Sequence, residues 1–335
     1  MKRLAEYLFT LWLILTLNFA LPRLLPGDPL AALFDPATSA FVFNDSARAR
    51  LMTYYGLDQP VLAQYGHYMT GLLRGDLGWS IYLNQPVAEL IAARLPWTLG
   101  LVLAAMLLAS GLSLAAGAEA AWRRNSAIDR LLTFVSVLVS NMPAFVTAML
   151  LIVVFAARLR WFPMAGGRTP FANYADFWQA ARDVLRHATL PLLTLASGMI
   201  AGNFLLIRNT MTGILGEDFI LVARARGLGA PQIRYRHALR NALLPFVAQF
   251  AAHAALAITG SVFVEAAFDY PGMGRLIFEA VNHRDYPLIQ GVFVVVSAAV
   301  LGANFLSDLA SQALDPRLKE AVSAQSKSNQ EVESA

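Results

Sequence analysis

Long apolar stretches without a charged side chain are the feature of this sequence that most limits its fold. Only 14% of the 335 residues are charged, whereas soluble domains carry about 25%. A helix that crosses the roughly 30 Å hydrocarbon core of a membrane needs about 20 mostly apolar residues. Five stretches without Lys, Arg, Asp or Glu meet this length: Trp97–Ala118, Leu131–Ala157, Ala188–Ile207, Ala242–Val264 and Tyr286–Leu306. We therefore predict an all-α polytopic membrane protein.

A sixth apolar stretch, Leu8–Leu21, follows Lys2 and Arg3 near the start of the sequence. A secretory signal has a similar pattern, but here no A-x-A-like cleavage site follows, and residues 22–26 continue directly into the chain. An uncleaved membrane anchor is the better interpretation. With this anchor, the bundle is predicted to have six transmembrane helices.

The distribution of arginine predicts which loops lie in the cytoplasm. Residues 209–241 contain five arginines between two predicted spans, against the acidic residues Glu217 and Asp218, and cytoplasmic loops carry an excess of Lys and Arg. Both termini are then expected in the cytoplasm. Residues 158–187 argue the other way, because their five arginines would lie outside, partly offset by Asp176 and Asp183.

This topology predicts four regions along the chain. Residues 1–25 form the N-terminal transmembrane helix, and residues 26–96 an external segment in which 47–55 and 61–73 suit short amphipathic helices. Residues 97–310 form a five-helix core with a cytoplasmic loop at 209–241. Residues 311–335 form a cytoplasmic tail, whose last part is polar and without an apolar period.

Several function classes lack their chemistry in this sequence. There is no cysteine, the net charge is only +4, and no phosphate-binding G-x-x-x-x-G-K-[ST] or nucleophilic G-x-S-x-G motif occurs. No two histidines show the i, i+4 spacing of a helical metal site. We predict no catalytic residue, no metal site and no nucleic-acid partner. Neutral polar residues within the spans suit either hydrogen bonds between helices or a substrate path: Asn141, Asn203, Gln249, His253 and Asn304.

The loop at 209–241 is predicted to be two short helices joined by a break. Residues 219–226 suit a helix, Gly227 and Gly229 can end it, and Pro231 can begin the next. Such a loop needs a protein partner, because it lies between two spans in the cytoplasm. The small residues Ala223, Ala225 and Gly227 would let a partner surface approach the backbone closely, with arginines as a charged rim.

The same loop carries a resemblance to a known family. Residues 219–228 read F-I-L-V-A-R-A-R-G-L, and residues 237–245 read H-A-L-R-N-A-L-L-P. They resemble the coupling loop of permease subunits of ABC importers for dipeptides, oligopeptides and nickel, approximately Y-V-x-T-A-R-A-K-G-L followed by H-A-L-R-N-A-L-x-P. Leu221 stands where a general permease signature has Glu, and the closing proline is displaced to Pro245. The resemblance implies that the ATPase-coupling residues are Ala223, Arg224, Ala225, Gly227, Leu228 and His237.

The resemblance covers most of the chain, from the first helix to about residue 317. Residues 25–29, 55–60 and 71–78 are similar to the family's external segment, and residues 271–275 and 284–287 to its last external loop. It implies a type I ABC importer permease fold with a tentative external gate. The gate residues would be Glu265, Pro271, Gly272, Gly274 and Asp285.

This resemblance also implies a mechanism and partners. Separate cytoplasmic ATPase subunits would hold ATP and Mg and move the coupling loop, so the chain itself needs no cofactor. A second homologous permease subunit, an external solute-binding protein and membrane lipid would complete the importer in the bacterial inner membrane. The expected ligand is a peptide or a peptide-sized molecule, with nickel or opine-type metal chelates as the alternative. A secondary transporter or a stand-alone channel is less supported, because the spans lack carboxylates.

Overall fold

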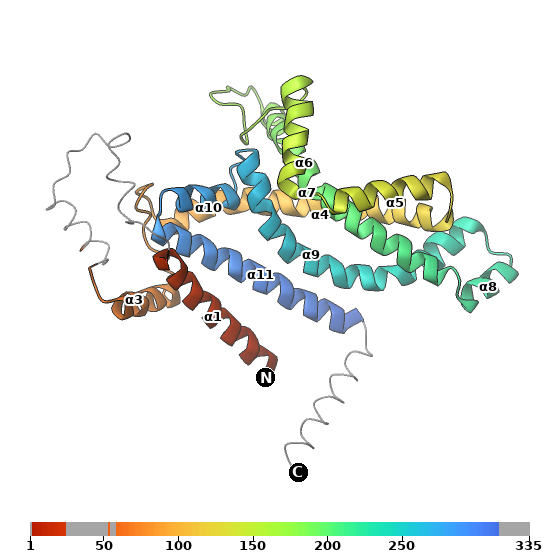
Figure 1. The fold of residues 1–335 in the computed structure, drawn as a ribbon, viewed down its shortest axis with the longest axis horizontal. Coiled ribbons are helices and arrows are strands. Elements are labelled where there is room, and N and C mark those ends of the chain that lie inside the picture. The colour runs from red at the N-terminus through yellow and green to blue at the C-terminus, as the bar shows by residue number, and fades with distance from the viewer. Residues whose placement is uncertain (1, 25–52, 54–57, 315–335) are drawn as a thin grey trace, which may run out of the picture. The chain divides into compact units, whose positions relative to one another are not determined.

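The computed structural model describes residues 2–24, 53 and 58–314, and the regular elements in this part of the chain are helices (Figure 1). Among the described residues, one isolated bridge between Trp79 and Pro86 is the only strand-like pairing. The elements are α1 (Lys2–Leu24), α3 (Val61–Leu73), α4 (Val87–Trp122), α5 (Ala127–Ser140), α6 (Ala144–Leu151), η2 (Ile152–Arg158), α7 (Phe177–Ile214), α8 (Asp218–Ala225), η3 (Gln232–Leu239), α9 (Arg240–Ala267), α10 (Met273–Asn282) and α11 (Tyr286–Leu314). The elements η2 and η3 are π-helical.

The predicted all-helical fold is confirmed for these residues. The short external helix predicted at 61–73 coincides with α3. Some predicted segments lie outside the described residues: the motif at 25–29, most of the helix predicted at 47–55, part of the motif at 55–60, and the tail from residue 315.

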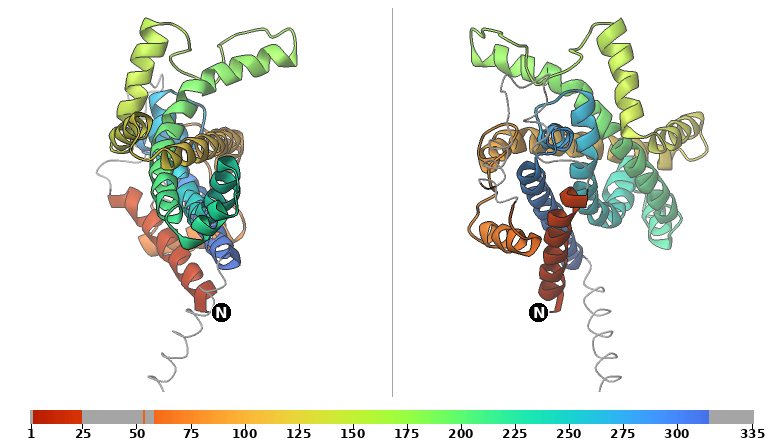
Figure 2. Two further views of the ribbon diagram at one scale, coloured as in Figure 1. Left: turned by 90° about the vertical axis from the view of Figure 1, so that its right-hand side faces the viewer. Right: turned by 60° about the vertical axis from the view of Figure 1, so that its left-hand side comes forward.

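Three described helices are long and apolar enough to cross a membrane: α4, α7 and the part of α11 at 286–305. The apolar stretch predicted as a span at 131–157 is divided between α5 and the α6–η2 pair, which are bent by 107° relative to each other (Figure 2). The bend lies at 141–143, where Pro143 lacks an N–H for a helical hydrogen bond and restricts the backbone before it. This pair counts either as one broken span or as a re-entrant loop. The shorter apolar stretches Phe9–Ala20 and Leu256–Ala267 lie in α1 and α9.

The described residues belong to two compact units. The first comprises residues up to 100, residues 165–170 and residues 261–301; the second comprises residues 101–164, 171–260 and those from 302 onward. Helices α4, α9 and α11 contribute residues to both.

The core of the first unit lies where the start of α4 meets α10 and the start of α11. Its buried side chains are Val87, Ile91, Met273, Leu276, Ala280, Leu288, Ile289 and Val292. Gly291 on α11 packs against this core, since a Cβ at this position would collide with Val87. The missing side chain therefore lets α11 approach α4 closely.

The core of the second unit lies at the cytoplasmic end of the predicted topology. It joins the end of α4, the end of α7, α8, η3 and the start of α9. At Gly117, a Cβ would collide with the side chain of Ile207, so α4 and α7 pack closely. This core supports the loop that carries the sequence motifs.

Candidate functional site

The break predicted between the two loop helices is a Schellman motif. Gly227 has φ +74°, a backbone angle that favours glycine. The Gly227 N–H donates to the Arg224 carbonyl at 2.9 Å, and the Leu228 N–H donates to the Ala223 carbonyl at 3.3 Å. These two bonds satisfy carbonyl groups that the end of α8 would leave unpaired. The predicted role of Gly227 as a helix terminator is confirmed.

The second loop helix begins as predicted at Pro231. This residue has φ −63° and needs no N–H partner at the start of a helix. The N–H groups of Gln232 and Ile233 both donate to the Gly229 carbonyl, at 3.0 and 3.1 Å. Gly229 itself is not among the described glycines with positive φ, so Gly227 alone makes the sharp turn.

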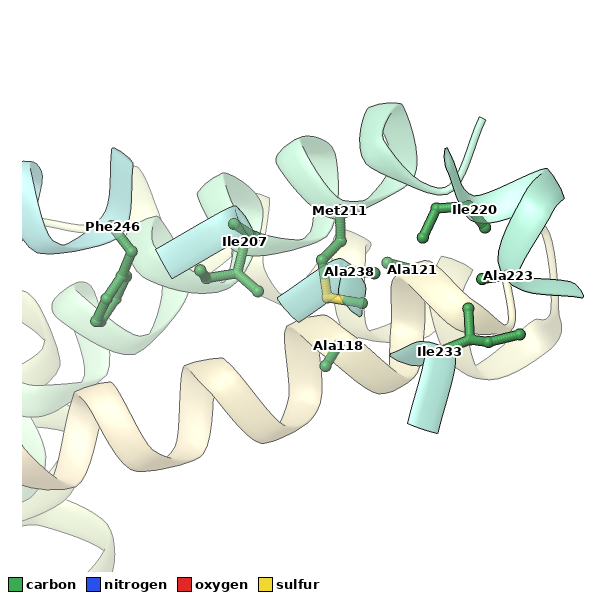
Figure 3. Packing of buried hydrophobic residues seen from close by; sticks show 10 residues of the cluster. Ala118, Ala121, Ile207, Met211, Ile220, Ala223, Ile233, Ala238 and Phe246 are labelled. Atoms are coloured by element: carbon green, nitrogen blue, oxygen red, sulfur yellow. The ribbon is translucent and has the colours of Figure 1, made fainter. Parts of the chain in front are cut away.

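The loop is fixed to the membrane helices by an apolar cluster (Figure 3). Ile220 on α8 is 1% exposed and Ile233 on η3 is 3% exposed. They meet side chains of the helices beside them, and the buried members are Ala118, Ala121, Ile207, Met211, Ile220, Ala223, Ile233, Ala238, Ala242 and Phe246. Because interiors are close-packed, these buried side chains hold the loop against the ends of α4 and α7.

An ion-pair network adds a polar connection between α4 and the loop. Glu119, on the last turn of α4, accepts from Arg234 on η3, and it also pairs with Arg123 at 2.5 Å. The guanidinium groups of Arg234 and Arg224 each lie 5.9 Å from the ring centroid of Trp122, within cation–π range. Arg234 is therefore a bridge inside the chain and not part of an exposed rim.

Glu119 and Trp122 also belong to this site, although they were not predicted as parts of it. Both follow the predicted span that ends at Ala118, so they read as an ordinary interfacial end of a helix. Their pairing with the loop depends on a sequence separation of 115 residues between Glu119 and Arg234. No local pattern signals such a contact.

The remaining predicted coupling residues divide between the interior and the surface. Ala223 is buried within the chain, so its small size serves this chain's own packing and not the approach of a partner. Arg224, Ala225 and Gly227 are exposed. Leu228 is half-buried against the apolar cluster, and His237, also half-buried, lies on η3.

The exposed face of α8 combines apolar and basic side chains. Phe219, Leu221 and Val222 are 43%, 67% and 50% exposed, respectively, and Arg224 lies beside them. A hollow of about 450 Å³ adjoins this face, lined by Trp122, Leu215, Arg224, Leu228, Ala230 and Ile233. Such a surface suits a protein partner, because apolar patches with arginine are typical of interface cores.

Two of the tentative gate residues, Glu265 and Gly274, form a buried contact in the first unit. The Glu265 side chain is 0% exposed, and its Oε2 accepts from the Gly274 N–H at 2.6 Å. A Cβ on Gly274 would collide with the backbone of Val262, and one on Gly272 would collide with Glu265. The two glycines thus allow the turn before α10 to close over a buried carboxylate.

Neighbouring groups hold the same turn. The Met273 N–H donates to Thr98 Oγ1 at 2.8 Å. Pro271 packs on Gly167, where a Cβ would collide with the proline ring. Burial, with a further contribution from the negative charge of Glu265, raises the pKa of Tyr270 to about 12, so its phenol is protonated at neutral pH.

Asp285, another tentative gate residue, is a buried structural anchor. It is 0% exposed, and its Oδ2 accepts from Ser80 Oγ at 2.6 Å and from the Tyr82 N–H at 2.9 Å. Its Oδ1 accepts from the Leu288 N–H at 3.1 Å, which caps the first turn of α11. The segment at 80–82 is thereby fixed to α11.

Polar residues of the predicted spans have different surroundings. Asn203 is buried, and its Oδ1 has no hydrogen-bond partner. Asn141 is exposed and donates to the Val137 carbonyl at 2.7 Å, Asn304 is half-buried, and Gln249 has a bonding partner. The side chain of His253 lies outside the description. Within the described part of the chain, no group of His, Cys, Asp or Glu is arranged to hold a metal ion.

The chain is similar to transport proteins along almost its whole length. It is 38% identical over 305 residues to a peptide permease protein of Brucella suis biovar 1, covering 90% of this chain and 93% of that protein. It is 35% identical over 318 residues to the glutathione transport system permease protein GsiC of Escherichia coli K12, covering 95% and 97%. It is 35% identical over 307 residues to the oligopeptide transport system permease protein AppB of Bacillus subtilis, covering 91% and 94%.

Residues 109–320, more than half of the chain, match the family described as binding-protein-dependent transport system inner membrane component. These residues include the coupling loop and the core on which it packs. The chain therefore belongs to this family: it is a permease subunit of an ABC importer in the inner membrane and not itself an enzyme.

Proposed function

We propose that this chain forms one half of a translocation path for short peptides, driven by ATP hydrolysis in separate subunits. The names of its relatives support the peptide class, since they include a peptide, a glutathione and an oligopeptide permease. The observation that carries the coupling part is the loop at 218–239, which presents an exposed face and packs its opposite face on α4 and α7.

The exposed face of α8 is the proposed dock for a cytoplasmic ATPase subunit, which holds ATP and Mg. Arg224, Ala225 and Gly227 contact that subunit directly in this proposal. Leu228 and His237 help to hold the loop in place. When the ATPase subunits close, their movement passes through the apolar cluster and the Glu119–Arg234 pair into the membrane helices.

The complete importer in this proposal has a second homologous permease subunit and an external solute-binding protein, and both permeases contact membrane lipid. Rocking of the two permease halves exposes the path alternately to each side. Six spanning helices with cytoplasmic termini follow from the apolar stretches and the basic loop. The buried contacts of Glu265 and Asp285 hold the external turns, so the proposed gate is a rigid frame and not a set of exposed side chains.

Labelling of Gly229→Cys tests the topology, because the parent chain has no cysteine and Gly229 is exposed on the loop. An impermeant thiol reagent is expected to label this position only after the cells are opened. Labelling in intact cells would place the loop outside and would contradict the coupling proposal.

Uptake in proteoliposomes tests the substrate class. The chain is reconstituted with its partner permease, ATPase subunits and binding protein, and uptake of a labelled dipeptide, a nickel chelate and a simple sugar is compared. ATP-dependent uptake of the peptide is expected. Uptake of the sugar alone, or peptide uptake that needs no ATP, would refute the proposal.

A further inference from the structure

A pocket of about 220 Å³ in the first unit contains none of the proposed coupling or gate residues. It is formed by the last turns of α1, by α3, by the turn at 76–81 and by the start of α11. Phe19, Arg23, Gln64, Tyr68, Tyr286 and Gln290 are among the side chains that line it. The pocket therefore combines an aromatic wall with a cation and amide groups.

Arg23 brings a guanidinium group to this pocket, and only some of its N–H donors have partners among the described residues. Its Nη1 donates to the Phe19 carbonyl at 2.8 Å, and its Nη2 donates to Gln64 Oε1 at 2.6 Å. The guanidinium lies 3.6 Å from the centroid of the Phe19 ring. No carboxylate of the described residues forms an ion pair with it. Because a guanidinium has five N–H donors, donors and a positive charge remain for a ligand.

Gln290 lines the same pocket and carries a buried donor without a partner among the described residues. Its side chain is 9% exposed, and this donor is its Nε2. A buried amide without a partner costs free energy, so a ligand that accepts from it would be stabilised. Tyr68 accepts from Asn18 Nδ2 at 3.2 Å, and its own O–H remains available. Burial is the largest influence on the pKa of Tyr68 and raises it, which keeps the phenol protonated.

The surroundings of the pocket indicate where its ligand comes from. Leu17 and Leu24 on α1 are 51% and 78% exposed, and Leu73 at the end of α3 is 88% exposed. Exposed leucines on a helix of a membrane protein suit contact with acyl chains. Asp76 also lines the pocket, but it is exposed and accepts from the Gly78 N–H at 2.8 Å. A headgroup that carries an ammonium beside its phosphate would complement this carboxylate.

We propose that this pocket binds the phosphate of a phospholipid headgroup, with Arg23, Gln290 and Tyr68 as its hydrogen-bond donors. Lipid bound here would hold the end of α1 and helix α3 against the start of α11. Arg23 is the principal anchor, since hydrogen bonds to a charged group are stronger than those between neutral groups.

The test measures binding of phosphatidylethanolamine to the purified complex of this chain with its partner subunits. After delipidation, the lipid is titrated back in detergent and bound molecules are counted by native mass spectrometry. Arg23→Gln is expected to weaken binding of one lipid about tenfold or more, from the loss of charge-assisted hydrogen bonds. The matched control, Arg74→Gln, changes an exposed arginine outside the pocket and is expected to bind as the parent does.

Two further experiments test the same proposal. A photoreactive phosphatidylethanolamine added to the parent complex is expected to label peptides containing residues 19–24, 64–78 or 286–291, and this result does not depend on how well a variant folds. Inorganic phosphate is expected to leave this labelling unchanged. Parent-like lipid binding by Arg23→Gln, labelling confined to other peptides, or displacement of the lipid by inorganic phosphate would overturn the proposal.

Discussion

Replacement of Gly227 by tryptophan separates docking of the coupling loop from its folding. Gly227 ends α8 with φ +74°, and a Cβ built there meets no atom within 4 Å. A Cβ at this position therefore points into open space and away from the described atoms of this chain. It would obstruct only a surface that approaches from outside.

The cost to folding is small and can be controlled. A residue other than glycine in the left-handed region costs roughly 1–2 kcal/mol, against a typical domain stability of about 5–15 kcal/mol. Gly227→Ala carries the same backbone cost without the bulk of an indole ring. Any difference between the two variants therefore reports on the space that a partner occupies.

The assay measures membrane abundance, co-purification of the ATPase subunit and ligand uptake for the parent and both variants. We expect near-parental abundance for both, with co-purification and uptake reduced about tenfold or more only in Gly227→Trp, which corresponds to about 1.4 kcal/mol of lost binding. If Gly227→Trp matches Gly227→Ala in co-purification and uptake, the loop is not the ATPase dock.

Three further predictions follow from the packing. Ile220→Ala, which empties a buried position of the loop core, should lower the free energy of unfolding by about 2–5 kcal/mol, measured by thermal unfolding. Leu221→Ala, on the exposed face of α8, should change the free energy of unfolding by less than about 0.5 kcal/mol. It should instead reduce co-purification of the ATPase subunit. The opposite pattern would reverse the assigned faces of α8. Asp129→Asn removes a carboxylate that accepts from Arg208 at 2.9 and 3.0 Å and should cost about 1.5–3 kcal/mol, as for hydrogen bonds to charged groups. Parental thermal stability would contradict this pairing. Gly274→Ala should lower the free energy of unfolding by about 1–3 kcal/mol through overpacking. Its control is Gly111→Ala, since a Cβ at Gly111 meets nothing within 4 Å. Equal melting temperatures of the two variants would refute the close contact at Gly274.

The two helices of the predicted coupling loop could be predicted well because their signals are local. Gly227 and Pro231 mark the end of one helix and the start of the next through backbone angles that few other residues adopt. The basic residues of the same loop predicted its cytoplasmic side, which remains a prediction. The direction in which Ala223 points could not be predicted, since burial depends on the side chains of α4 and α7 that meet α8.

The surroundings of the tentative gate residues, in contrast, could not be predicted from local signals. Residues 271–275 and 284–287 were recognised from motifs, and the motifs predicted an external gate loop. In the structure, Glu265 and Asp285 are buried and accept hydrogen bonds from backbone N–H groups. A motif preserves residue types and spacing but does not distinguish a carboxylate that faces a ligand from one that holds a turn.

Local signals in the sequence predict the membrane environment of this protein, its helical class and the positions of the two loop helices, because apolar length and helix-ending residues act over short distances along the chain. Three features are apparent only in the folded chain: the bend of 107° in the apolar stretch at 131–157, the pairing of Arg234 with Glu119, and the pocket that a cation and an unpaired amide share. These features join residues far apart in sequence. Their free energies come from packing and charge pairing between separate helices, which no local pattern encodes.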